Sequence, residues 1–166
     1  LGGVHVLVNN AGIGTAVPAT RETPQQFREV IDVNLNGCYW MAQACGRVMK
    51  PGSSIINISS TGAFQYSGTG AALYSITKAG VNRLTETLAV EWSRFNINVN
   101  AIAPGLFASE MSDGMIERMG DLTRHFPRRR IGQPENLDST LLYLVSPASE
   151  MVTGTIIKVD DGQGGR

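Results

Sequence analysis

Tyr74 and Lys78 stand four residues apart in the segment Y-S-I-T-K. A tyrosine is a poor acid or base near neutral pH because its unperturbed pKa is about 10, so proton transfer through it needs a nearby cation. Residues four apart on a helix share a face, which places the Lys78 ammonium where it stabilises the phenolate. The pair indicates proton transfer in carbonyl or alcohol redox chemistry. A surface tyrosine beside a solvated lysine is the competing interpretation, because this spacing is common.

Two further polar segments follow apolar runs. Ser59 and Ser60 end the run at residues 54–58, and Asn10, Ala11 and Gly12 follow the run at residues 4–8. Ligands bind at the carboxyl ends of the strands in parallel α/β sheets. Both segments can also be ordinary turns. Their position after strands favours a shared site with Tyr74.

Strand and helix patterns alternate along the chain, as in βαβ units. Thr23 and Pro24 supply an N-cap and a first-turn proline for the first helix. The sequence therefore predicts an α/β fold with a parallel sheet of about four strands, followed by a flexible tail at residues 162–166. The predicted strands are residues 4–8, 54–58, 97–103 and 155–159, and the other predicted helices are residues 34–49, 72–95, 109–119 (a short mobile lid) and 134–145.

Composition narrows the class of protein. The 166 residues are enough for one domain, residues 1–166. Lys plus Arg (14) balance Asp plus Glu (14), which argues against nucleic-acid or membrane partners. We therefore interpret residues 128–130 (Arg-Arg-Arg) as a solvated loop. Cys38 and Cys45 are too far apart on one helix to bridge. The given sequence shows neither an apolar stretch long enough to span a bilayer nor the layout of a signal peptide, although a missing N-terminus could have carried a targeting segment. We expect a soluble cytoplasmic protein without a metal site.

The chain resembles the short-chain dehydrogenase/reductase family, in its common NAD(P)-dependent subtype. The resemblance implies part of a Rossmann-like, doubly wound parallel sheet. The segments that carry it are L-V-N-N-A-G-I (residues 7–13), V-I-D-V-N-L-N-G (30–37), I-I-N-I-S-S (55–60), Y-S-I-T-K-A-G (74–80) and I-N-V-N-A-I-A-P-G (97–105).

This resemblance assigns catalytic roles to four residues. Tyr74 would be the general acid in carbonyl reduction and the base in alcohol oxidation, and Ser60 would hydrogen-bond the substrate oxygen. Lys78 would lower the tyrosine pKa and hold the nicotinamide ribose. Asn34 would kink its helix and anchor a water of the proton relay, although an ordinary helix N-cap is the alternative. Ser60 precedes Tyr74 by fourteen positions, one more than is usual, so Ser59 or Thr61 could carry the hydroxyl instead.

The implied cofactor is NAD or NADP. Asn10, Ala11 and Gly12 would line the adenosine-ribose side, and Tyr74 and Lys78 would also contact the cofactor. Pro104, Gly105, Phe107 and Ser109 would border the nicotinamide, with Ser109 in the place of a threonine that bonds the carboxamide.

The family's T-G-x-x-x-G-x-G loop and its first strands should precede Leu1, so the resemblance implies an N-terminally truncated chain. The residues that decide between NAD and NADP belong to that part. The strand at residues 4–8 would then be an exposed apolar edge, which predicts association or instability. Asp161 replaces a glycine of the C-terminal V-D-G-G motif and is expected to strain a turn.

The sequence thus predicts an NAD(P)-dependent oxidoreductase that interconverts a secondary alcohol and a ketone. Residues 100–111 resemble β-ketoacyl-thioester reductases and sugar-alcohol or gluconate dehydrogenases alike, so the substrate stays open. The alternative is a catalytically incompetent fragment that acts at most as an assembly surface. Relatives imply a homodimer or homotetramer that pairs through the helices at residues 34–49 and 72–95.

Overall fold

The computed structural model describes residues 2–66, 68 and 70–164 of the chain. Its sheet is parallel throughout, with the order β1-β2-β3-β4 and registers such as Val8 opposite Ile56 and Ala103 opposite Lys158. Each strand lies within two residues of its predicted position, so the predicted parallel sheet is confirmed. The strands are β1 (Val6–Asn9), β2 (Ser54–Ile58), β3 (Asn98–Pro104) and β4 (Ile156–Val159).

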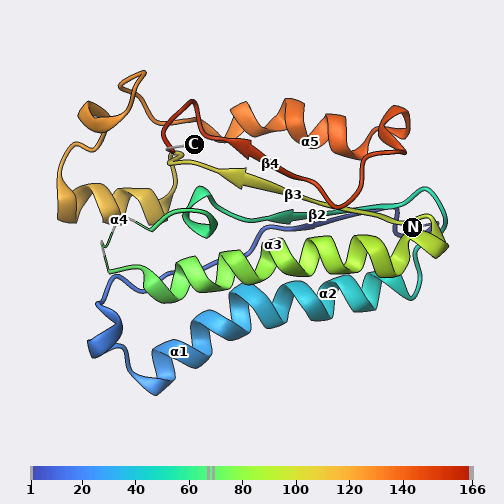
Figure 1. Ribbon diagram of the computed structural model, residues 1–166, viewed down its shortest axis with the longest axis horizontal. Coiled ribbons are helices and arrows are strands. Elements are labelled where there is room, and N and C mark those ends of the chain that lie inside the picture. The colour runs from blue at the N-terminus through green and yellow to red at the C-terminus, as the bar shows by residue number, and fades with distance from the viewer. Residues whose placement is uncertain (1, 67, 69, 165–166) are drawn as a thin grey trace.

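Helices cover the sheet on both faces, as in a doubly wound fold. Figure 1 shows α1, α2 and α3 on one side and α5 on the other, while α4 lies at the end toward which the strand arrows point. The predicted fold class is therefore confirmed. The helices are α1 (Pro24–Ile31), α2 (Gly37–Gly46), α3 (Ala72–Trp92), α4 (Glu110–Met119) and α5 (Asp138–Val145).

The helix around Asn34 differs from the prediction. Thr23 caps α1 in a capping box with Gln26. The backbone then stays helical through a π-helical turn, Asp32–Asn36, directly into α2. Asn34 lies in the middle of that turn and is not an N-cap, so the N-cap interpretation is wrong. Such π turns frequently occur at functional sites, where they move a side chain out of the regular helical register.

Two apolar clusters hold the layers together. Ile55 and Val99 pack against Leu88 and Ala89 of α3 on one face of the sheet. Ile56 and Ile102 pack against Leu144 of α5 on the other face. Neighbouring strand residues therefore serve opposite clusters, as the alternation of side chains along a strand requires. Among the helices described, none combines the length and apolar character needed to cross a membrane.

β1 forms one edge of the described sheet, and part of its apolar surface is uncovered. Leu7 packs against the cluster on the α3 side, whereas Val6 and Val8 are 45% and 39% exposed on the opposite face. An edge strand with exposed β-branched side chains is a template for association. This geometry agrees with the apolar edge expected from the sequence.

The purified chain is therefore expected to self-associate or to melt without a cooperative transition. The experiment is sedimentation velocity together with thermal melting by circular dichroism. Val6→Lys should reduce association by placing a charge on the uncovered face of β1. Met151→Lys is the matched control, because Met151 is 89% exposed and lies outside the strands. A cooperative melt of a monomeric wild-type chain would contradict the prediction.

Candidate active site

Tyr74 is the third residue of α3, and its ring is half-buried between two loops. A Cβ at Gly14 would lie 3.5 Å from Tyr74 Cδ2, and one at Gly62 would lie 3.9 Å from Cε1. Burial raises the pKa of the Tyr74 hydroxyl, and a hydrogen bond from the Ser60 side chain opposes that rise. The phenol is therefore protonated at neutral pH, which suits it to donate a proton.

Lys78 lies one turn further along α3 and is 3% exposed. Its Nζ donates a hydrogen bond to Ile58 O at 2.8 Å, at the end of β2, and lies 5.6 Å from the centre of the Tyr74 ring. Burial lowers the pKa of Lys78, and the nearby Cys38 thiol acts in the opposite direction. The competing interpretation of a solvated lysine is wrong, because the ammonium lies inside the protein.

The expected lowering of the Tyr74 pKa by Lys78 is not found. The net direction for Tyr74 is upward, and the largest cause is burial. The physical reason is that both side chains are withdrawn from water, which disfavours the phenolate and the ammonium alike. The two groups share a face of α3 as the spacing predicts, but the sign of the shift is set by desolvation.

The structure separates the roles of the two serines that end β2. Ser60 Oγ accepts a hydrogen bond from Gly62 N at 3.0 Å, and the Ser60 side chain also forms a hydrogen bond with Tyr74. Ser59 is 2% exposed, and its Oγ lies 2.6 Å from Asn82 Oδ1 on α3. Ser60 therefore faces Tyr74, whereas Ser59 joins β2 to α3. Thr61 begins the 3₁₀ turn that follows.

Asn34 fastens the loop after β1 to the helices. Its Oδ1 accepts from Ile13 N at 2.8 Å, and its Nδ2 donates to Ile13 O at 2.8 Å and to Thr77 Oγ1 at 3.0 Å. The side chain is fully buried. The helix irregularity expected at Asn34 is present, and its side chain holds the loop against α3. A role in a proton relay stays a prediction.

The loop at residues 10–12 fits the approach of a cofactor. Asn10 and Ala11 are exposed, and a Cβ at Gly12 would lie 3.2 Å from Lys78 Nζ and 3.6 Å from Asn34 Oδ1. Because Gly12 has no side chain, its backbone lies close to the buried Lys78 ammonium. Ile58 O is the one hydrogen-bond acceptor of Nζ within the described residues, so two of its three N–H bonds are available to a ligand hydroxyl.

The second group of predicted cofactor residues lies at the end of β3. Pro104 is the last residue of that strand, and a Cβ at Gly105 would overlap Gln163 Oε1. Phe107 pairs with Gly132, and its ring occupies the space beside that glycine. Ser109 is exposed and caps α4 by accepting from Ser112 N at 3.2 Å. Its hydroxyl therefore already has a structural role, and its bond to a carboxamide stays a prediction.

Sequence reasoning missed a buried polar network behind the site. Asn9 Nδ2 donates to Asn57 Oδ1 at 2.8 Å and to Cys38 O at 3.2 Å, and Asn57 Nδ2 donates to Thr85 Oγ1 at 2.9 Å. Asn57 and Thr85 are fully buried. Asparagine within the otherwise apolar strand β2 was the available signal, because a buried amide needs partners.

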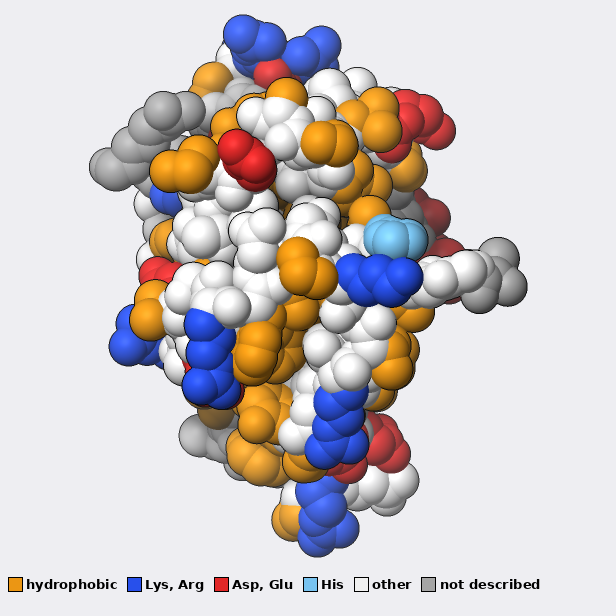
Figure 2. Space-filling view, turned by 90° about the vertical axis from the view of Figure 1, so that its right-hand side faces the viewer, with side chains coloured by type: hydrophobic (Ala, Val, Ile, Leu, Met, Phe, Trp, Pro, Cys, Tyr) orange, Lys and Arg blue, Asp and Glu red, His pale blue; other side chains and the backbone are white. Residues whose placement is uncertain are grey.

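A cavity of about 710 Å³ lies away from these residues, between the carboxyl-terminal ends of α2 and α3. Its walls include Tyr39, Gly46, Trp92 and Phe95. Figure 2, which shows that end of the molecule, has exposed hydrophobic side chains in a hollow flanked by lysine and arginine side chains. None of the residues expected in catalysis lines it, so it is separate from the Tyr74 site.

The buried ammonium of Lys78 gives a testable dependence of stability on pH. Its pKa is lower in the folded chain than the unfolded value of about 10.4, so the unfolded chain binds more protons between these two values. The free energy of unfolding should therefore rise with pH across that window, because the cost of the buried charge is relieved. Urea denaturation of wild type and Lys78→Met between pH 7 and pH 10.5 measures it.

The free energy of unfolding of wild type minus that of Lys78→Met should become more positive as the pH rises. Lys50→Met is the control, because Lys50 is exposed. A difference that stays constant with pH for Lys78→Met would contradict a buried ammonium at this position.

Comparisons with known proteins match nearly the whole chain. The family described as Enoyl-(Acyl carrier protein) reductase matches residues 1–163. The galactitol 2-dehydrogenase (L-tagatose-forming) of Cereibacter sphaeroides is 37% identical, and the alignment covers 96% of this chain and 65% of that protein. The 2-dehydro-3-deoxy-D-gluconate 5-dehydrogenase of Escherichia coli is 34% identical, with 97% and 66% covered.

Solved structures of dehydrogenases also match nearly the whole chain. The gluconate 5-dehydrogenase from Burkholderia cenocepacia, in complex with NADP and tartrate, superposes with a TM-score of 0.90 at 33% identity. The match covers 98% of this chain and 66% of that one. The chain thus spans about two thirds of the length of these relatives.

Proposed function

Because the chain belongs to the short-chain dehydrogenase/reductase family, we propose that it is an NAD(P)-dependent oxidoreductase that interconverts a secondary alcohol and a ketone. The observation that carries the proposal is the arrangement of Ser60, Tyr74 and Lys78. Two hydroxyl groups meet at the carboxyl end of β2, with a buried ammonium one helical turn behind them.

The two hydroxyls are arranged to act on one substrate oxygen. Gly62 N occupies an acceptor position of Ser60 Oγ, so the Ser60 proton is free to turn from Tyr74 to a carbonyl oxygen. Tyr74 donates its proton to the same oxygen in reduction and removes it in oxidation. Lys78 stabilises the phenolate that remains after proton donation. The nicotinamide supplies or accepts the hydride when bound.

The residues that would hold the cofactor come from two loops. Asn10, Ala11 and Gly12 supply backbone at the end of β1, and the two available N–H bonds of Lys78 suit ribose hydroxyls. Pro104, Gly105 and Phe107 supply the opposite wall at the end of β3. A relative binds NADP, and the 4-hydroxyisoleucine dehydrogenase, at a TM-score of 0.82, is complexed with NADH. We propose that this chain uses one of these two cofactors.

For the substrate we propose a polyol or a sugar acid. Two of the relatives are named for galactitol and for 2-dehydro-3-deoxy-D-gluconate. The β-ketoacyl thioesters, which the sequence left open, are the competing class. A panel of galactitol, gluconate and an acetoacetyl thioester, with absorbance at 340 nm as the readout, distinguishes the two classes.

The experiment that tests the function is a fluorescence titration of the purified protein with NADPH and NADH. Saturable binding followed by turnover on the panel supports the enzyme. Binding should weaken in Lys78→Met, whereas Lys50→Met should bind as wild type does. Absence of binding by a folded chain would favour the alternative of an inactive assembly surface.

The same preparation tests the oligomeric state. We propose a homodimer or homotetramer that pairs through the outer faces of α2 and α3. Trp40, Met41, Ile76 and Val90 on those helices are 50–78% exposed, so pairing through this face would bury apolar surface. Light scattering that shows a monomer at micromolar concentration would count against pairing.

A further inference from the structure

Residues 106–132, the flap, form a loop whose two ends are joined. Gly132 N donates to Leu106 O at 2.9 Å, and Ala108 N donates to Gly132 O at 2.9 Å. The Phe107 ring fills the space beside Gly132, where a Cβ would lie only 2.5 Å from a ring carbon. α4 lies within the flap, and the flap begins where the proposed nicotinamide wall of Pro104 and Gly105 ends.

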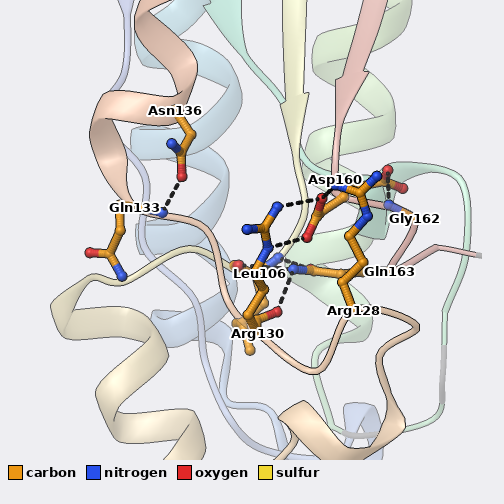
Figure 3. Close-up of polar contacts among 9 residues, drawn as sticks. Leu106, Arg128, Arg130, Gln133, Asn136, Asp160, Gly162 and Gln163 are labelled. Atoms are coloured by element: carbon orange, nitrogen blue, oxygen red, sulfur yellow. Dashed lines mark hydrogen bonds and ion pairs between the residues drawn. The ribbon is translucent and has the colours of Figure 1, made fainter.

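The turn that follows β4 fastens this joint from a third segment. Gln163 Oε1 accepts a hydrogen bond from Leu106 N at 2.5 Å, and Gln163 Nε2 donates to Leu106 O at 3.3 Å. The Gln163 amide thereby pairs with both backbone groups of Leu106, as Figure 3 shows. The expected flexible tail is therefore held at Gln163, and residues 165 and 166 lie outside the described residues.

Asp161 fastens the far end of the flap. Its carboxylate accepts from Arg130 Nε at 2.7 Å and Nη2 at 3.1 Å, and from Arg128 Nη1 at 3.1 Å. The two arginines, interpreted from the sequence as a solvated loop, are thus anchored by one carboxylate, although their side chains are 67% and 62% exposed. Arg130 binds the carboxylate through two nitrogens, and Arg128 binds the same carboxylate. Such a bidentate, networked ion pair fixes the relative positions of its side chains better than an isolated surface pair does.

The backbone of Asp161 supports a specific role for this carboxylate. Its φ is 52°, in the left-handed region that favours glycine, which agrees with the strained turn expected where aspartate replaces glycine. The backbone of an aspartate is strained in this conformation, whereas the backbone of a glycine would not be strained. The ion pairs with Arg128 and Arg130 give a physical reason for the substitution, because a glycine could not make them.

We propose that Asp161 is a positioning residue that, together with Gln163, fastens the flap to the turn after β4 and so fixes the wall of the cofactor site that begins at Gly105. The connection to the cofactor rests on the proposed function. The fastening itself is a property of the fold. It joins three segments that are far apart in the sequence: residues 106–108, 128–132 and 160–163.

The test is hydrogen–deuterium exchange of the flap, read by mass spectrometry, in wild type, Asp161→Asn, Arg130→Met and the double variant. Asparagine tolerates the left-handed conformation, so Asp161→Asn removes the charge and keeps the turn. Asp161→Gly also removes the strain. Glu86→Gln is the matched control, because it breaks the exposed pair between Arg83 and Glu86 on α3, away from the flap. NADPH affinity is measured in parallel by fluorescence.

Flap amides should exchange about 3- to 10-fold faster in Asp161→Asn and in Arg130→Met, and NADPH should bind more weakly by a similar factor. The double variant should exchange no faster than Asp161→Asn, because that substitution already removes the ion pairs with both arginines. Raising the salt from 50 mM to 500 mM should accelerate flap exchange in wild type but not in Asp161→Asn. A general structural role would not produce this salt dependence.

Flap exchange in Asp161→Asn equal to that of wild type, or equally changed in Glu86→Gln, would overturn the proposal. If flap exchange is faster in the variants but neither they nor the wild type bind NADPH, the result supports the fastening of the flap and counts against the proposed function. The two proposals therefore fail separately.

Discussion

Replacement of Tyr74 by phenylalanine is expected to lower kcat/KM by about 10²- to 10⁴-fold, the usual contribution of general acid–base catalysis. The substitution removes the hydroxyl that faces Ser60 and leaves the ring between Gly14 and Gly62, so the packing of α3 should not change. The measurement is steady-state kinetics on the substrate found in the panel, with circular dichroism and NADPH binding as checks on the fold.

Tyr143→Phe is the matched control, because Tyr143 is 50% exposed on α5, on the opposite face of the sheet. It should keep wild-type kinetics. Undiminished turnover in Tyr74→Phe would rule out the assigned acid and base. Equal losses in both variants would indicate damage to the fold.

The pH dependence of the same reaction should show whether the pKa of Tyr74 is raised or lowered. Its pKa is raised in the free protein, and kcat/KM reports the free enzyme. Reduction, which needs the protonated phenol, should therefore keep its kcat/KM through neutral pH and lose it only above about pH 10. In Tyr74→Phe this alkaline limb should disappear.

Replacement of Ser60 by alanine is expected to lower kcat by about 10²- to 10³-fold, as for removal of one hydrogen-bond donor from a reacting oxygen. Ser60→Ala also removes the acceptor of Gly62 N, a part-buried turn hydrogen bond whose loss should cost about 1 kcal/mol. Kinetics and urea denaturation of the same preparation measure the two effects.

Ser59→Ala is the adjacent control and should show the opposite pattern. Ser59 is buried and bonded to Asn82, so its loss should cost about 1–3 kcal/mol of stability, with kcat little changed. If Ser59→Ala lost activity and Ser60→Ala did not, the assignment of the substrate hydroxyl would have to be reversed.

The amino-acid sequence was sufficient for the fold class and for most element boundaries. The four predicted strands and the start of α1 at Thr23 were confirmed, because apolar alternation and capping residues act over a few neighbouring positions. The same local rule placed Lys78 on the face of α3 that carries Tyr74, since four residues make about one helical turn.

Features that depend on packing could not be derived this way. Asn34 looked like an N-cap because its partners, the backbone of Ile13 and the Thr77 hydroxyl, are 21 and 43 positions away. Which of the two adjacent serines lies beside Tyr74 likewise depended on packing, because Ser59 bonds to Asn82 of α3 whereas Ser60 precedes the next turn.

By itself, then, the sequence determined that this protein is a parallel α/β fold with serine, tyrosine and lysine at one end of the sheet, because periodicity and strand ends are encoded locally. Only the tertiary structure decided the sign of the Tyr74 pKa shift, since desolvation depends on which loops close over the ring. It also decided that Asp161 binds Arg128 and Arg130, because contacts between residues more than thirty positions apart exist only after the chain has packed.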